Sequence, residues 1–355
     1  MGEDRTQAIV GCLLGTAIGD ALGLPVEGLS RRRQHRIYPH ALDRYHLLFG
    51  KGMVSDDTEH ACMVAQSLIV SGGDEKQFSR LLGWRLRWWL LALPAGVGFA
   101  TLRAIVKLWL GFPSSRSGVF SAGNGAAMRS AILGVCYGDN VEKLRALVQI
   151  STRITHTDPK AEYGALAVAM AAYTSSTEAI VTPQVYRQNL AAVLDADVTE
   201  FWRLIDRVID SANGTCSVES LAAELGCSGG VSGYVYRTVP IVLRVWLEYP
   251  DRYREAISQI IRLGGDTDTT AAILGAIVGA RVGKSGIPQR WQDDLWEWPR
   301  TIAWVERLGE RLAQTIETGG LQPALSLPIL GVLARNLLFA IVVILHGFRR
   351  LLPPY

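Results

Sequence analysis

The sequence predicts an all-α fold of roughly ten or more helices, with an apolar helix appended at the C-terminus. Apolar residues recur at i, i+3 and i+4 spacing through most of the chain, which is typical of helices. Alternating β-branched runs bounded by hairpin turns are nearly absent. Hydrophobic residues make up 49% of the 355 residues, enough for a large buried core. We therefore expect one large helical domain over residues 1–317, followed by an appendage.

The individual helices follow from segments of apolar periodicity between Gly, Pro and polar breaks. They are expected at residues 8–22, 58–71, 76–93, 126–137, 141–152, 161–173, 198–212, 233–247, 253–263, 267–280 and 294–315. Several are rich in Ala and Gly, which lets helix backbones approach closely, so we expect them to be buried on several sides. No self-similar repeat is visible, which argues against a solenoid.

Charge and cysteine content exclude several classes of protein. The chain has 36 Lys and Arg against 33 Asp and Glu, which leaves no electrostatic footprint for nucleic acid. Its five cysteines are odd in number and form no C-x-x-C pair, so neither a zinc knuckle nor a disulfide framework is expected. The polar N-terminus does not resemble a secretory signal. A reducing cytoplasm is the expected location.

The C-terminal segment differs from the rest of the chain. Residues 318–326 contain two glycines and a proline and are expected to be a linker. Residues 327–355 form an apolar tail, in which Arg335 and Asn336 interrupt the apolar run. On a membrane-insertion scale its apolar gain and the cost of Arg335 nearly cancel. Three arrangements therefore stay open: a helix docked on the domain, a membrane-surface or re-entrant segment within residues 327–350, or a membrane span.

A first acidic cluster begins the helix expected at residues 58–71. It contains Ser55, Asp56, Asp57 and Thr58. Serine and aspartate at a helix start are also what capping and the helix dipole favour. Two adjacent carboxylates exceed what a cap needs, however, and they repel each other unless a cation lies between them.

A second acidic cluster begins the helix expected at residues 267–280. Asp266, Asp268 and Thr269 follow two glycines that permit a tight turn. This cluster alone is equally well explained as a helix cap. Together the two clusters offer an all-oxygen set of carboxylates and hydroxyls, the ligand set of Mg²⁺, Mn²⁺ or Ca²⁺. No histidine or cysteine accompanies them, which disfavours zinc, and four carboxylates balance two divalent ions.

A further carboxylate follows the first expected helix. Glu27 lies just past a Gly-Leu-Pro stop, where the helix dipole offers a carboxylate no stabilisation, so we expect it to have a functional role. Within that helix, the spacing of Gly15 and Gly19 indicates close helix packing, and Asp20 is expected to bond a neighbouring backbone.

A glycine-rich loop precedes the helix expected at residues 126–137. Gly123, Asn124 and Gly125 can form a backbone nest that holds an anion such as phosphate, although an ordinary turn explains them as well. The loop lacks the Gly-Lys-Ser/Thr ending of a P-loop. His156 stands before another expected helix, as a capping residue or as a ligand contact.

Taken in order, these segments resemble the ADP-ribosylglycohydrolase family, which includes the glycohydrolase that reactivates ADP-ribosylated dinitrogenase reductase. The resemblance covers residues 11–280 and leaves out the tail. The stretches that carry it are GCLLGTAIGDALGLPVEG, VSDDTEHACMVAQSL, SAGNGAAMRSAILG, THTDPKAEYGALAVA and LGGDTDTTAAILGAIVGA.

The resemblance implies a compact orthogonal helix bundle with two Mg²⁺ ions, or Mn²⁺ in their place, at the base of a cleft. The implied metal ligands are Ser55, Asp56, Asp57, Asp266, Asp268 and Thr269. The implied contacts to ADP-ribose are Gly123, Asn124, Gly125 and His156. Glu27 matches the family's mobile glutamate and is, with Asp57 and Asp268, a candidate catalytic residue. Ser55 stands where many members carry threonine, and Tyr234 and Tyr236 are the candidates for stacking on adenine.

The function implied is Mg²⁺-dependent hydrolysis of the bond between ADP-ribose and a protein side chain, an arginine N-glycosidic bond being favoured, or a small molecule. Two alternatives remain: a silent relative that binds ADP-ribose, or a hydrolase of another nucleotide-like ADP-ribosyl substrate. Intact acidic clusters argue against silence. Loops at residues 31–45 and 96–116 are expected to form the cleft walls that select the acceptor.

Overall fold

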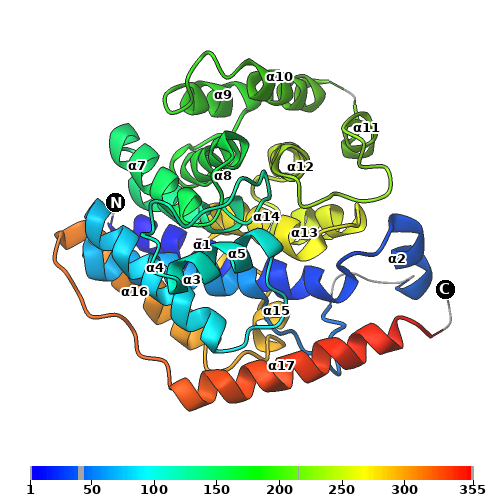
Figure 1. The fold of residues 1–355 in the computed structure, drawn as a ribbon. Helices are drawn as coiled ribbons and strands as arrows, with labels where there is room; N and C mark the ends of the chain where they lie inside the picture. Colours follow the sequence, from blue (N-terminus) through cyan, green and yellow to red (C-terminus); the bar gives the residue numbers. More distant parts are fainter. Residues whose placement is uncertain (1, 39–43, 215, 353–355) are drawn as a thin grey trace.

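The structure, a computed structural model, describes residues 2–38, 44–214 and 216–352. Its described residues form seventeen α-helices and short 3-10 turns, with isolated β-bridges as their only extended pairings, which confirms the all-α prediction (Figure 1). The helices are α1 (Gly2–Gly23), α2 (Arg31–Ile37), α3 (Asp56–Ser71), α4 (Glu75–Leu91), α5 (Phe99–Trp109), α6 (Ala131–Tyr137), α7 (Val141–Arg153), α8 (Pro159–Thr177), α9 (Pro183–Ala191), α10 (Thr199–Asn213), α11 (Val218–Glu224), α12 (Val235–Glu248), α13 (Tyr253–Arg262), α14 (Thr267–Val282), α15 (Gln289–Asp293), α16 (Ile302–Thr318) and α17 (Ile329–Arg349).

The pair formed by α1 and α14 is the centre of the bundle (Figure 1). Glycines recur every four residues along α1, at positions 11, 15, 19 and 23, and each faces the backbone of α14. A Cβ added to Gly15 would lie 2.0 Å from the carbonyl oxygen of Gly275, and one added to Gly19 would lie 2.1 Å from that of Ala271. The two helices run antiparallel in backbone contact, which brings the C-terminal end of α1 beside the N-terminal end of α14.

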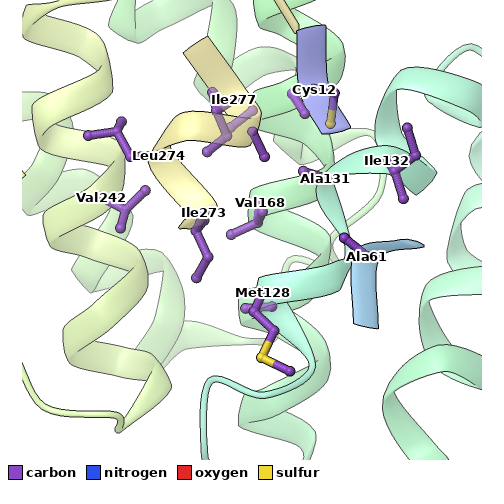
Figure 2. Packing of buried hydrophobic residues seen from close by; sticks show 14 of the residues in the cluster. Cys12, Ala61, Met128, Ala131, Ile132, Val168, Val242, Ile273, Leu274 and Ile277 are labelled. Carbon is purple, nitrogen blue, oxygen red and sulfur yellow. The ribbon is translucent and has the colours of Figure 1, made fainter. Parts of the chain in front are cut away.

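The remaining core surrounds α14, which is buried on all sides. Its side chains pack against α8 and α12 and against the turn that precedes α6. Figure 2 shows members of this core from several helices, and those labelled are Cys12, Ala61, Met128, Ala131, Ile132, Val168, Val242, Ile273, Leu274 and Ile277. Because small residues line these helices, the bundle holds α14 rigidly and with it the second acidic cluster.

Several elements differ from the expected ones. Helices α2 and α5 occupy segments expected to be loops, and α9, α11 and α15 were not expected. Helix α2 is short and strongly basic, so its sequence shows little apolar periodicity. The helix expected at residues 294–315 begins only at Ile302, after a cis peptide bond between Trp298 and Pro299.

The expected linker runs between α16 and α17 without helix or strand, and hydrogen bonds fix it to α3 and α16. Gln66 of α3 bonds both the amide and the carbonyl of Leu325, and Arg311 donates to the carbonyl of Pro323. Helix α17 then crosses the lower face of the bundle in Figure 1 and ends beside α2. Of the three arrangements considered for the tail, the structure has the helix docked on the domain.

Within the described residues, two helices are long and apolar enough to cross a membrane by length and composition alone. One covers residues 4–26, and its apolar part is completely buried in the bundle. The other is α17, which is one-third buried. These properties by themselves do not separate a core helix from a membrane helix.

Candidate active site

The first acidic cluster is held in place by a buried carboxylate of α1. Asp20 accepts hydrogen bonds from the amides of Ser55 (2.9 Å) and Thr58 (3.2 Å) and from the Thr58 hydroxyl (2.5 Å). These are the free amides of the first turn of α3, which a carboxylate stabilises. Burial raises the pKa of Asp20 to about 6, against the lowering effect of these hydrogen bonds. Asp20 therefore positions α3, as its place within the first helix predicted.

The two acidic clusters meet at Asp57. Its Oδ2 accepts hydrogen bonds from the hydroxyls of Ser55 and Thr269, each at 3.2 Å, although Thr269 lies 212 residues further along the chain. Its Oδ1 is buried and has no hydrogen-bond partner among the described residues. The structure thus brings together side chains that the sequence separates by most of its length.

A third carboxylate joins the second cluster from the end of α1. Glu27 follows the 3-10 turn at Leu24–Val26, and one oxygen from each of Glu27, Asp266 and Asp268 lies within 4.8 Å of the other two. Glu27 is exposed, Asp266 is half-buried and Asp268 is buried with its Oδ1 unpartnered within the described chain. Glu27 therefore lies at the mouth of the acidic site and Asp268 at its floor.

The electrostatics of this group favour a bound cation. Burial raises the pKa values of Asp56, Asp57 and Asp268 well above their ordinary range, and the charges of neighbouring carboxylates raise them further. Loss of solvent and the charge of Asp266 also raise the pKa of Glu27. Carboxylates in such positions must take up protons or a metal ion. The two orphaned carboxylate oxygens and the all-oxygen donor set fit a hard divalent cation.

The glycine-rich loop lies against the second acidic cluster. Asn124 donates to Oδ2 of Asp266 (2.7 Å) and to the Thr238 hydroxyl (3.1 Å), so it connects the loop to α12 and to the start of α14. A Cβ on Gly123 or Gly125 would lie 3.2 Å or 3.0 Å from the ring of His156. The loop backbone can approach the ring this closely because both residues lack a side chain.

A buried arginine connects this loop to the first cluster. Arg129 is hydrogen bonded to His60 of α3 (3.0 Å) and to the Thr155 hydroxyl (2.7 Å), and Thr155 is bonded to the His156 ring (2.8 Å). Burial and the Arg129 charge lower the pKa of His156 to about 3. His156 is therefore a neutral ring held at the wall of the site. Sequence reasoning had missed Arg129 and His60.

These groups surround a cavity of about 1070 Å³. Every predicted site residue lines it except Asp57, which lies directly beneath, bonded to Ser55 and Thr269. Residues 95–101 and 103 form one wall, which includes part of the segment expected at residues 96–116. Residues of the other expected wall, 31–45, do not line it where the structure describes them; residues 39–43 lie outside the described residues.

Two aromatic residues in the cavity were not predicted. Phe99 and Phe120 line it with 72% and 78% of their surfaces exposed. The signal for Phe120 was its position three residues before the glycine-rich loop. The two expected aromatics do not line the cavity: Tyr236 is buried against Phe201, and the Tyr234 hydroxyl bonds Lys160. The side chain of Tyr234 turns toward Lys160 of α8 and that of Tyr236 toward Phe201 of α10.

Helix α17 supplies a further part of the wall. Phe339 and Val343 line the cavity beside Leu24, Ala95 and Val97, and they make that side of it apolar. No sequence signal placed the tail at the cleft.

The sequence and the fold are similar to those of known proteins. A family model described as ADP-ribosylglycohydrolase matches residues 1–321. An uncharacterized protein of Archaeoglobus fulgidus is 33% identical over 80% of this chain and 90% of its own. The ADP-ribosyl-[dinitrogen reductase] glycohydrolase of Rhodospirillum rubrum is 26% identical, over 81% and 89% of the two chains. Among solved structures, an ADP-ribosylglycohydrolase-related protein complex matches with a TM-score of 0.68 and 27% identity, over 88% of this chain and 99% of that one.

Proposed function

The chain belongs to the ADP-ribosylglycohydrolase family, and from that premise we propose that it hydrolyses the N-glycosidic bond between ADP-ribose and an arginine side chain in a Mg²⁺-dependent reaction. The family supports hydrolysis of ADP-ribose linkages. The observation that carries the proposal for this chain is the meeting of two acidic clusters at the base of one cavity, with two buried carboxylate oxygens left without partners.

Six residues would hold two Mg²⁺ ions, or Mn²⁺ in their place. These are Ser55, Asp56, Asp57, Asp266, Asp268 and Thr269. When bound, such ions supply Lewis acidity and orient substrate oxygens. Their positive charge would also compensate the buried carboxylates, which otherwise repel one another.

Other residues that line the cavity would bind the ADP-ribose. The loop of Gly123, Asn124 and Gly125 would contact the diphosphate, and His156, neutral and fixed by Thr155, would border it. The Asn124 amide donates to the carbonyl of Gly233 (2.9 Å) and the Gly123 amide to the Ser121 hydroxyl (3.3 Å), so the loop would act chiefly through the close approach that its glycines permit. Phe120 offers an exposed ring on which the adenine can stack.

Carboxylates near the reacting carbon would stabilise the positive charge that develops as the glycosidic bond breaks. Glu27 lies at the mouth of the site with a raised pKa and is placed to accept a proton from the attacking water. Asp57 and Asp268 are fixed more deeply and would act through their charge.

A second candidate substrate is a small ADP-ribosyl conjugate rather than a modified protein. The cavity wall formed by Leu24, Phe339 and Val343 is apolar. The carboxylates that line the cavity all belong to the proposed metal site or are Glu27, which leaves no further acid in the described lining to pair with a guanidinium. An apolar or aromatic leaving group would suit that wall.

We place this activity in the cytoplasm. All five cysteines are free thiols, and four of them are buried, which fits a reducing compartment.

Defined conjugates of ADP-ribose with arginine, serine and a nucleobase would test the proposal. With Mg²⁺ present, free ADP-ribose should be released fastest from the arginine conjugate, and EDTA or Asp268→Asn should abolish release. Fastest release from another conjugate would confirm a hydrolase but show that its substrate is not ADP-ribosyl-arginine. Binding of ADP-ribose without release from any conjugate would instead identify a silent relative.

A further inference from the structure

Helix α17 has its polar and apolar faces reversed relative to an ordinary docked helix. The face that packs on the domain carries Arg335, Asn336 and His346 together with a few apolar residues. The face turned outward is apolar from Ile329 to Phe348, and only Arg349 at its end is charged. Water-soluble bundles show the opposite arrangement, with apolar residues inward and polar residues outward.

The inward polar residues anchor the helix to the catalytic domain. Arg335 is 3% exposed and donates to Glu297 (2.7 Å) and to the carbonyl of Val54 (2.6 Å), next to the first acidic cluster. Asn336 donates to the carbonyl of Ala92 (2.7 Å), and His346 bonds the carbonyl of Pro25 (2.8 Å). These bonds fix the rotation of α17 about its axis, so its outward face is determined by the domain.

The outward face forms a continuous apolar stripe. Successive members lie one, three, four or seven residues apart, as one side of a helix requires, with Leu352 just beyond the end of α17, and each is between 42% and 81% exposed. We call them the outer stripe: Leu330, Leu337, Leu338, Ile341, Ile344, Leu345, Phe348 and Leu352. An exposed apolar surface of this length marks an interaction site.

Aromatic residues flank the stripe at its N-terminal end. Trp296 and Trp298 are half exposed, and the Trp298 ring lies so close to Gly331 that a Cβ there would be 3.2 Å from it. Tryptophan is enriched where a protein meets the boundary between lipid headgroups and acyl chains.

Arginines gather at the other end of the stripe. Arg32, Arg33 and Arg36 of α2 line a hollow of about 430 Å³, and Arg33 donates to the carbonyl of Arg350 at 2.6 Å. Arg349 is exposed beside them. Residues 318–355 contain no aspartate or glutamate. The stripe therefore ends beside a cluster of arginines, and the C-terminal segment that carries the stripe has no acidic residue to pair with them.

We propose that α17 lies in the surface of an anionic lipid membrane, with the outer stripe among the acyl chains and the arginine cluster against the headgroups. An interfacial helix combines these two features, and its binding depends on both. A second copy of the chain fits this surface less well, because its tail would offer the arginines no carboxylate in either orientation. A membrane span fits less well too, because it would remove Arg335 from Glu297.

The consequence for the enzyme is one of location. Phe339 and Val343, on the inner side of the same helix, line the cavity, so the cleft would lie close to the lipid surface. This proposal is independent of which bond the enzyme hydrolyses.

Cosedimentation of the full-length protein with vesicles tests it. Vesicles of phosphatidylcholine containing about 30% phosphatidylserine should bind the protein, neutral vesicles should bind it at least about tenfold less, and high salt should weaken binding. The triple variant Ile341→Gln, Leu345→Gln, Phe348→Gln and the double variant Arg32→Gln, Arg349→Gln should each reduce binding about tenfold. Matched controls are Ile180→Gln, an exposed apolar residue elsewhere, and Arg203→Gln with Arg207→Gln on α10.

Three outcomes would overturn the proposal. Absence of binding to anionic vesicles is one. A second is a parent protein that forms a dimer by light scattering but does not bind vesicles, together with a triple variant that is monomeric. That result would assign the outer stripe to contact with a second copy of the chain. Retention of the protein in vesicles after an alkaline carbonate wash would assign it to a span. Melting temperatures of the variants within about 2 °C of the parent's would show that they remain folded.

Discussion

Replacement of Asp57 by asparagine should stabilise the metal-free protein and remove its response to Mg²⁺. The Asp57 side chain is 1% exposed, and its pKa is raised well above the ordinary value by burial and by the charges of Asp56 and Asp20. The unfolded chain loses the proton near pH 3.8, while the folded protein retains it to higher pH. The contribution of Asp57 to stability is therefore fully present below pH 3.8 and is lost as the pH rises through the folded-state pKa of this one group.

The magnitude follows from that difference. Each unit by which the folded pKa exceeds the unfolded one costs about 1.4 kcal/mol at neutral pH. Asparagine has no charge to desolvate, and it keeps an oxygen for the hydroxyls of Ser55 and Thr269. We expect it to raise the metal-free stability by about 1 to 2 kcal/mol after the weaker hydrogen bonds are counted.

Bound Mg²⁺ should make the parent more stable than Asp57→Asn, the reverse of their order without metal. A ligand at a hundred times its dissociation constant adds about 2.7 kcal/mol to the folded state. The parent should gain about this much from Mg²⁺, whereas Asp57→Asn should gain little. Thermal unfolding in EDTA and in a Mg²⁺ series measures both effects, with the exposed residue changed in Asp197→Asn as a control. A variant less stable than the parent in EDTA, or one that gains equally from Mg²⁺, would refute the reasoning.

Three further predictions concern the framework of the site. The pKa of His156 is lowered to about 3, so the folded protein keeps this ring neutral while the unfolded chain protonates it near pH 6.5. This group therefore lowers the free energy of unfolding as the pH drops below 6.5. In urea unfolding, His156→Gln should lose less unfolding free energy than the parent between pH 7 and pH 5. Gly15→Ala places a Cβ 2.0 Å from the Gly275 carbonyl oxygen and should cost about 1 to 3 kcal/mol of unfolding free energy; an unchanged value would mean that α1 and α14 can separate freely. Arg335→Met leaves the buried Glu297 carboxylate, 1% exposed, without its main partner and should lower the free energy of unfolding by about 3 to 5 kcal/mol. Adding Glu297→Gln should restore part of that free energy. If it restores none, the loss does not come from an unpaired buried charge.

Much of the site could be predicted because local chemistry expresses it. The acidic clusters stand at helix starts, where hydroxyls and carboxylates have a reason to occur, and their pairing exceeds what capping explains. The glycines at positions 15 and 19 predicted a close helix contact, and the structure shows it against α14.

Other parts depend on contacts that local sequence does not express. Asn124 orients Asp266 only because the loop before α12 returns to the start of α14. Arg129 is a single basic residue in an apolar stretch, and its role comes from three partners on other elements. The place of Phe339 in the cavity depends on the rotation of α17, which three polar anchors set. Short helices such as α2 leave too little periodicity to be recognised.

The central claim is that two distant acidic clusters form one divalent metal site. Anomalous diffraction from crystals grown with Mn²⁺ tests it most directly, since the signal locates the metal without reference to activity. We predict two anomalous peaks within coordination distance of Asp57 and Asp268, both lost in Asp57→Asn crystals. Peaks confined to exposed carboxylates elsewhere, or a fully occupied Mn²⁺ retained in the variant, would contradict the account.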